Sequence, residues 1–253
     1  MLADHFRPRH PRELSSEELR SFLLHQIERR HLAAATISQL INAMRFLYVE
    51  LYKKPFALGN LRRPRKEKKL PVVLSGEEVQ GLFESLGNLK HRTMMMLVYS
   101  AGLRVGELVK LRPEDIDGKR KMIHIHGGKG KKDRYTVLSD FVLEALREYW
   151  KTYHPAKYLF EGQEPEKPYS PRSAQQVFEN AKEKAHIKKD VSIHSLRHAF
   201  ATHLLEQGTD IRFIQELLGH ASVKTTEIYT HVSTRTIAQI KSPIDSLMRP
   251  RKA

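Results

Sequence analysis

The chain has 253 residues, of which 40% are hydrophobic and 29% charged, so it is long enough to bury one large core or two smaller ones. Its 44 lysines and arginines outnumber 29 acidic residues, and the formal net charge of +15 favours a polyanionic partner: DNA, RNA or an anionic membrane. The absence of cysteine excludes disulfides, thiolate zinc sites and cysteine nucleophiles.

The sequence shows no segment that would direct it into a membrane. The first twelve residues are polar and basic, unlike the apolar core of a signal peptide. The longest apolar stretches, such as Met94 to Tyr99, are far too short to cross a bilayer. We therefore expect a cytoplasmic protein without a membrane partner.

Residues 1–61 are predicted to form a small, all-helical domain. Ser15 opens a capping-box pattern, and apolar residues follow it at helical spacing up to Ile27. A second helical stripe runs from Ile37 to Leu51, and Pro55 and then Gly59 break it.

Residues 62–71 are predicted to be a basic linker between two domains. The segment has almost nothing to bury, and its cations are bracketed by prolines. In a chain this basic we expect the linker to lie against a phosphate backbone; a solvated linker without contacts is the alternative. The predicted DNA-binding residues in it are Arg62, Arg63, Arg65 and Lys66.

Residues 72–253 are predicted to form a larger domain. Ser75 begins another capping box, an apolar helix from His91 ends at Gly102, and a short helix over 104–111 follows. Two strands, 122–126 and 134–138, flank a glycine- and lysine-rich segment and predict a hairpin. Further helices are predicted over 140–152, 171–185, 194–207, 210–218, 222–229 and 234–248. The predicted fold is therefore mainly α, with small antiparallel β-hairpins and two domains.

Arg104, His194 and Arg197 predict a phosphate-binding site. His194 and Arg197 are spaced to share a face near a helix N-terminus, where backbone amides already attract anions. Paired guanidiniums can hold several phosphate oxygens and stay charged when partly desolvated. The alternative for either arginine is a structural salt bridge with a residue such as Glu107.

Tyr229 is a candidate nucleophile, and His220 a candidate hydrogen-bond donor to the same phosphate. A phenol with a pKa near ~10 needs a lowered pKa or a proton acceptor to attack at neutral pH. The two nearby guanidiniums are expected to supply the lowered pKa. Gly219 frees the backbone to turn and aim His220. Alone, the tyrosine would be read as amphipathic packing and the histidine as a helix cap.

Lys129 lies between two glycines at the predicted hairpin tip, where it could protonate a departing 5′ oxygen. The spacing around it does not match a P-loop. Lys131 and Lys132 are competitors for that role, or DNA-binding residues on a basic loop.

Taken together, these motifs over residues 72–235 resemble the tyrosine recombinase (phage integrase) family, most closely its Xer-like branch. The motifs that carry the resemblance are Ala101-Gly-Leu-Arg104, Gly128-Lys-Gly130, the run His194-Ser-Leu-Arg-His-Ala-Phe-Ala-Thr-His203, Leu217-Leu-Gly-His220 and Thr225-Thr-Glu-Ile-Tyr-Thr-His231.

The resemblance implies a catalytic set of Arg104, Lys129, His194, Arg197, His220 and Tyr229, with Tyr229 as nucleophile and Lys129 as acid. It implies no metal and no cofactor, and a DNA-linked 3′-phosphotyrosine that preserves the energy for rejoining. It further implies a SAM-like core-binding domain in residues 1–61, which is shorter here than is usual in the family. The segment 234–248 resembles a helix that docks onto a neighbouring protomer.

The same resemblance implies a homotetramer that exchanges strands through a Holliday junction between two copies of a short, partly palindromic double-stranded DNA site. The leading functional prediction is an Xer-like recombinase that resolves chromosome dimers for chromosome partition. Alternatives are the integrase of a mobile element, a type IB topoisomerase-like enzyme and a non-catalytic DNA-binding regulator.

Overall fold

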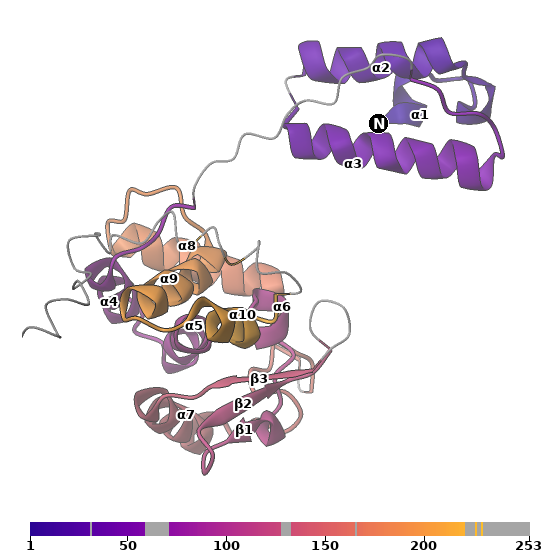
Figure 1. Ribbon diagram of the computed structural model, residues 1–253. Coiled ribbons are helices and arrows are strands. Elements are labelled where there is room, and N and C mark those ends of the chain that lie inside the picture. Colours follow the sequence, from indigo (N-terminus) through magenta and orange to yellow (C-terminus); the bar gives the residue numbers. More distant parts are fainter. Residues whose placement is uncertain are drawn as a thin grey trace, which may run out of the picture. The chain divides into compact units, whose positions relative to one another are not determined.

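A computed structural model describes residues 1–30, 32–58, 71–127, 133–164, 166–220, Thr226 and Tyr229. It divides into two compact units, Met1–Lys69 and Leu70–Ala253 (Figure 1). Within the described residues, no helix is both long and apolar enough to cross a membrane.

The N-terminal unit is helical, as predicted. Ser15 caps its first long helix by accepting a hydrogen bond from the Glu18 backbone, while the Glu18 carboxylate accepts one from the Ser15 backbone. Its elements are α1 (Leu2–His5), η1 (Pro11–Glu13), α2 (Ser16–Glu28), α3 (Ala34–Arg45) and the π-helical turn η2 (Phe46–Leu51).

The core of this unit lies between α2 and α3. It consists of Leu14, Leu19, Phe22, Leu23, Ile37, Ile41, Met44 and Tyr48. The predicted stripe runs on to Leu51, but Leu51 is 61% exposed. The wider π-helical turns of η2 change the angular step per residue, so the 3.6-residue spacing fails there.

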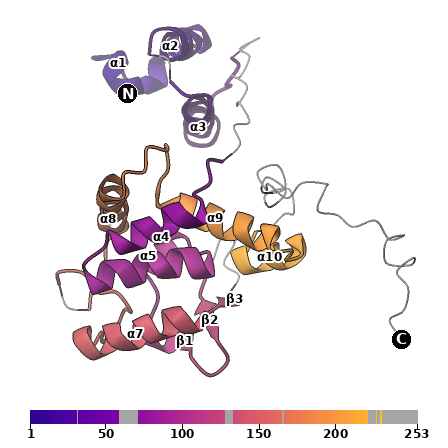
Figure 2. The same cartoon turned by 90° about the vertical axis from the view of Figure 1, so that its left-hand side faces the viewer.

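The larger unit is built around the buried helix α5 (Leu89–Ala101), which packs against α9 (Ile193–Glu206) and α7 (Asp140–Tyr153) (Figure 2). Asn88 caps the start of α5, and Gly102 ends it in the left-handed conformation with φ +61°. The remaining helices are α4 (Gly76–Glu84), α6 (Val105–Leu108), η3 (Pro113–Asp115), α8 (Pro171–Lys184) and α10 (Ile211–Leu218).

A small antiparallel sheet lies beside α7 (Figures 1 and 2). The predicted hairpin is present as β2 (Met122–Ile125) and β3 (Arg134–Val137), in a register that pairs Ile125 with Arg134. A third strand, β1 (Ile116–Asp117), pairs with β2 and has too few residues to leave a periodic signal. The mainly α fold with a small antiparallel sheet and two units is confirmed.

One predicted helix is shorter than expected, and two lie wholly or mostly outside the described residues. The helix expected over 104–111 is only one turn, α6, because the chain turns away before Pro113. The helix over 234–248 lies outside the described residues, and of the segment 222–229 only Thr226 and Tyr229 lie within them.

Candidate active site

Glu107 is the carboxylate around which the site is assembled. Arg104 is the N-cap residue of α6, and both its backbone N–H (2.8 Å) and its Nη1 (2.7 Å) donate to Glu107. Arg134, the first residue of β3, donates from Nη1 and Nη2 to the two carboxylate oxygens at 2.8 and 2.9 Å. Burial alone would raise the pKa of Glu107, but the hydrogen bonds from Arg134 and Arg104 outweigh it and lower that pKa to about 2.

Arg197 projects from α9 into the interior, where only 5% of its surface is exposed. Its Nη1 donates to the carbonyl of Gly102 (2.5 Å) and its Nη2 to the carbonyl of Leu218 (2.6 Å). These carbonyls lie at the C-terminal ends of α5 and α10, the ends that carry partial negative charge. Nη1 also lies 3.7 Å from Glu107. Burial and the nearby Arg104 lower the pKa of Arg197 to about 10, so it stays protonated at neutral pH.

His220 follows the left-handed Gly219 that ends α10, and the turn brings its imidazole to Arg197. Its Nε2 lies 3.3 Å from Nη2 of Arg197, and its Nδ1 lies 3.0 Å from the hydroxyl of Thr226. Burial, Arg197 and Arg104 lower the pKa of His220 to about 4, so the ring is neutral at pH 7. A neutral ring that accepts from Arg197 at Nε2 carries its proton on Nδ1 and donates it to Thr226.

Tyr229 is 1% exposed and packs among Phe200, Ala201, Ile214 and Leu218. Its hydroxyl lies 3.0 Å from Nδ1 of His198, the residue that follows Arg197 on α9. The expectation of a lowered phenol pKa is wrong. Burial raises the pKa of Tyr229, and the opposing effect of Arg197 and Arg104 is smaller.

Arg104 and His194 line a pocket of about 510 Å³. His194 is exposed there, and partial desolvation together with Arg197 and Arg104 lowers its pKa below the ordinary value. The other residues that line the pocket are Gly106, Glu107, Lys110, Leu111, Asp115, Ile125, His126 and Gly127. An anionic group that enters this pocket therefore meets both an arginine and a histidine of the predicted site.

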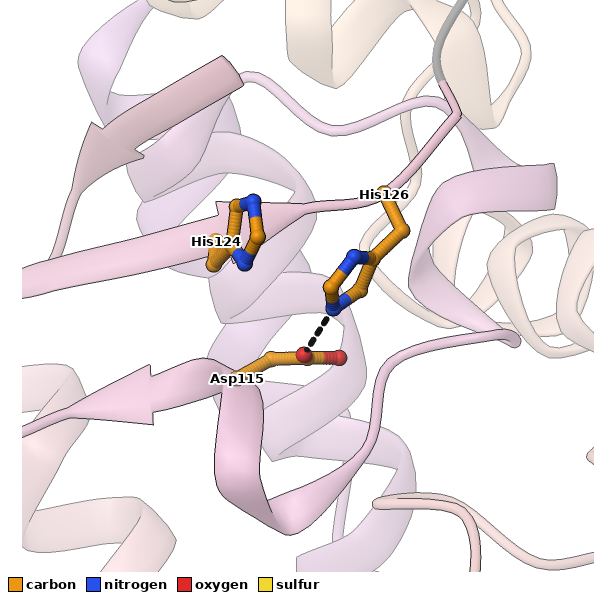
Figure 3. A group of neighbouring side chains, drawn as sticks. All are labelled: Asp115, His124 and His126. Atoms are coloured by element: carbon orange, nitrogen blue, oxygen red, sulfur yellow. Dashed lines mark hydrogen bonds and ion pairs between the residues drawn. The ribbon is translucent and has the colours of Figure 1, made fainter. Parts of the chain in front are cut away.

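Asp115, His124 and His126 gather at the end of β2, beside the same pocket (Figure 3). Nε2 of His126 lies 2.7 Å from Oδ1 of the buried Asp115. Asp133, across the hairpin, accepts a hydrogen bond from the backbone of Gly127 at 2.7 Å. In the part of the chain that the structure describes, Asp115, His124 and His126 form the one group placed to share a metal ion. The hydrogen bond between His126 and Asp115, and Asp133 within 3.6 Å of both histidines, already account for the arrangement.

The structure therefore brings Arg104, Arg197, His194, His220 and Tyr229 into one region, from segments far apart in the sequence. The other predicted residues lie outside the described part of the chain: Lys129, Lys131, Lys132, Arg62, Arg63, Arg65 and Lys66.

Three residues of the site were not predicted as functional. Glu107 was considered only as an alternative salt-bridge partner, although its position three residues after Arg104 is a capping-box signal. The sequence presents Arg134 only as the first residue of a strand, and His198 only as part of a motif. Both make their decisive contacts with residues 27 and 31 positions away, and no local pattern reports such contacts.

Two family models, several curated proteins and several solved structures match this chain. The model described as "Phage integrase family" matches residues 73–235, and "Phage integrase, N-terminal SAM-like domain" matches residues 1–57. The chain is 37% identical over 238 residues to "Putative integrase/recombinase y4eF" of Sinorhizobium fredii, covering 94% of this chain and 95% of that protein. It is 36% identical to tyrosine recombinase XerD of Staphylococcus aureus over 224 residues, 82% of this chain and 75% of that one.

Among solved structures, XerH site-specific recombinase bound to its difH substrate in a pre-cleavage complex is similar, with a TM-score of 0.72 and 25% identity. The match covers 90% of this chain and 70% of XerH. The catalytic-domain model matches more than half of this chain, and both curated relatives are more than 30% identical to it over most of their own length. This chain therefore belongs to the phage integrase family of tyrosine recombinases.

Proposed function

We propose that this recombinase cleaves and rejoins duplex DNA through a 3′-phosphotyrosine at Tyr229, with an Xer-like role in resolving chromosome dimers. The observation that carries the chemistry is the convergence of two arginines, a neutral histidine and a buried tyrosine. Arg197 lies 3.3 Å from His220 and 3.7 Å from Glu107, which also binds Arg104. Tyr229 is near enough for both guanidiniums to affect its pKa.

In this proposal Arg104 and Arg197 bind the non-bridging oxygens of the scissile phosphate. The carbonyls of Gly102 and Leu218 fix the plane of the Arg197 guanidinium, which has further N–H groups to donate. Preorganised donors of this kind stabilise the charge that develops as the phosphate becomes five-coordinate. His194 faces the pocket and adds a hydrogen bond to the phosphate. His220 accepts from Nη2 of Arg197 and so helps to orient that guanidinium.

Lys129 is proposed as the acid that protonates the departing 5′ oxygen. The support is positional, because Gly127 lines the pocket and precedes Lys129 by two residues. Lys131 and Lys132 would then contact the DNA backbone. None of these steps requires a metal or another cofactor in this proposal.

Double-stranded DNA is the proposed partner. The net charge of +15 supports it, and XerH, a relative in fold, is bound to its difH substrate. We extend the proposal to a SAM-like domain in residues 1–61 and a linker over 62–71 that contact DNA, with residues 72–253 as the catalytic domain. Four protomers would act on two partly palindromic sites through a Holliday junction, and cytoplasmic DNA would be their substrate.

The integrase of a mobile element is the second candidate. It is favoured by the nearly full-length match to a protein named as an integrase/recombinase. Selecting bound fragments from a genomic library and footprinting them separates the two roles. A single chromosomal site whose two copies recombine supports dimer resolution, whereas sites at the ends of a movable segment support integration.

A suicide duplex with a nick near the cleavage position tests the chemistry, because the short product diffuses away and traps the covalent complex. We expect an adduct in the presence of EDTA from the native chain and from Tyr153→Phe, a control on an exposed tyrosine. Tyr229→Phe should give none. An undiminished adduct from Tyr229→Phe, or none from the native chain, would overturn the proposal.

A further inference from the structure

The hydroxyl of Tyr229 is a buried donor that needs an acceptor. The residue is 1% exposed, so water does not satisfy its O–H, and leaving the group unpaired would carry a desolvation cost. Within the residues that the structure describes, the group within hydrogen-bond distance of this hydroxyl is Nδ1 of His198, at 3.0 Å. The two rings are 5.7 Å apart and inclined by 50°, so the contact joins the ring nitrogen to the phenol and is not a stacking contact.

The protonation states of the pair fix the direction of this hydrogen bond. Burial, Arg197 and His194 lower the pKa of His198, so its ring is neutral at pH 7 and offers one lone pair. Burial raises the pKa of Tyr229, so the phenol keeps its proton. The phenol O–H therefore donates to Nδ1, and the ring proton of His198 is on Nε2.

The other histidines of the site are turned to other partners. His220 contacts Arg197 through Nε2 and Thr226 through Nδ1, and His194 is exposed in the pocket. The charged and titratable groups around His198 are Arg197 and His194 on its own helix, His220 after α10, and Tyr229 itself. Of these histidines, His198 is the one in contact with the atom that would attack phosphorus.

We propose that His198 is a catalytic base, which takes the phenol proton of Tyr229 as the tyrosine attacks DNA. This inference rests on the function proposed above. The Oη–H bond of Tyr229 breaks and its proton passes to Nδ1 of His198, while the Oη–P bond forms. The P–O5′ bond breaks, and the 5′ oxygen takes a proton from the acid, proposed as Lys129. On rejoining, the 5′ hydroxyl attacks phosphorus and returns its proton to the acid. The Oη–P bond breaks, and His198 returns its proton to the departing phenolate.

A proton acceptor at this position explains how a tyrosine with a raised pKa can attack at neutral pH. The two guanidiniums do not lower the phenol pKa enough to offset its burial. Transfer to His198 removes the need for a free phenolate before attack, because the proton moves as the bond to phosphorus forms. The resulting imidazolium lies next to Arg197, so it readily gives the proton back in the reverse step.

Two substitutions separate proton transfer from positioning. Asparagine places its Oδ1 near the position of Nδ1, so His198→Asn keeps a hydrogen-bond acceptor that cannot take the proton. His198→Ala removes both the hydrogen-bond acceptor and the proton acceptor. His203 supplies a matched control on the same helix, because its Nδ1 lies 2.9 Å from the hydroxyl of Tyr99. His203→Asn therefore alters an equivalent histidine–tyrosine pair whose tyrosine is not the proposed nucleophile.

The experiment measures single-turnover cleavage of the suicide duplex between pH 5 and 9, with circular dichroism and urea midpoints as checks on folding. The native chain should lose rate at acidic pH, as His198 becomes protonated. His198→Asn should cleave about 10²-fold more slowly or worse and should lack that acidic decline, whereas His203→Asn should behave as the native chain does. A substrate with a 5′-bridging sulfur should not rescue His198→Asn, because its better leaving group replaces an acid and not a base.

Three results would overturn the inference. His198→Asn at the native rate would show that proton transfer to His198 is not needed. A slow His198→Ala beside a normal His198→Asn would reduce His198 to a positioning residue. The absence of an adduct from the native chain would refute the proposed function, and this inference with it. If the native chain forms the adduct and His198→Asn cleaves at the native rate, only this inference is refuted.

Discussion

Replacing Glu107 by glutamine removes one charge from the centre of the site and keeps the side-chain volume. The carboxylate accepts hydrogen bonds from Arg134 and Arg104 and lies 3.7 Å from Arg197, with 10% of its side chain exposed. The variant would leave three guanidiniums close together without a counter-charge. A buried network that loses one ionic partner is strongly destabilised, because the remaining charges stay desolvated.

The magnitude follows from the pKa of the carboxyl. A fall from the ordinary value of 4.5 to about 2 corresponds to roughly 3 kcal/mol at about 1.4 kcal/mol per pKa unit. Removal of one partner from a buried ion pair costs a similar amount, about 3–5 kcal/mol. We therefore expect Glu107→Gln to lower the free energy of unfolding of the catalytic unit by about 3 kcal/mol at pH 7.

The dependence on pH has a definite sign. A carboxyl whose pKa is depressed by folding stabilises the native state above its unfolded pKa, and that contribution disappears as pH falls through the folded pKa. For Glu107 the window runs from just above 4.5 down to about 2. The difference in stability between the native chain and Glu107→Gln should therefore be full at pH 7 and should shrink as the pH falls through this window.

Urea unfolding monitored by circular dichroism measures the difference, with the slope m checked for constancy. Glu114→Gln is the matched control, since Glu114 is 65% exposed and its nearest cation, Arg112, is 3.5 Å away. That variant should change the free energy of unfolding by less than about 1 kcal/mol. A Glu107→Gln variant no less stable than Glu114→Gln would refute the view that Glu107 organises the arginines.

Three further outcomes are expected. Gly102→Ala should lower the free energy of unfolding, measured in urea, by about 2 kcal/mol or more, because a Cβ at φ +61° would lie 2.6 Å from Phe200. Gly87→Ala is the control and should change it little, because a Cβ there would meet nothing within 4 Å. Equal effects of the two substitutions would contradict this expectation. Cleavage by Lys129→Ala should be slow and rescued by a 5′-bridging sulfur; rescue of Lys131→Ala instead would move the acid by two residues. When the basic linker is neutralised, the slope of log K against log salt for DNA binding should flatten by roughly 0.9 for each phosphate that the linker no longer binds, and an unchanged slope would indicate a solvated linker. The residues to be replaced together in this last test are Arg62, Arg63, Arg65 and Lys66.

Elements that are specified by local signals could be predicted from the sequence. Ser15 and Ser75 form the expected capping boxes, and Gly102 and Gly219 end their helices in the left-handed conformation. Each of these signals acts over a few residues, so the pattern and its structural consequence lie close together in the chain. β1 and the π-helical turn η2 were missed because one is two residues long and the other abandons the helical period.

The candidate site was predictable as a set of residues but not as a set of contacts. The sequence motifs identified Arg104, Arg197, His220 and Tyr229, which the structure brings together. The link from Arg134 to Glu107 and the link from His198 to Tyr229 join different elements, and only the packed fold specifies them. The raised pKa of Tyr229 has the same origin, because the burial that raises it comes from residues of α9 and α10.

Peptide mapping of the trapped protein–DNA adduct tests the proposed chemistry most directly. After nuclease and protease digestion, mass spectrometry should find a nucleotide attached through its 3′ phosphate to the peptide that contains Tyr229. The same digestion of Tyr229→Phe should yield no modified peptide. A nucleotide attached to any other residue, or attached to Tyr229 through a 5′ phosphate, would contradict the proposed cleavage chemistry.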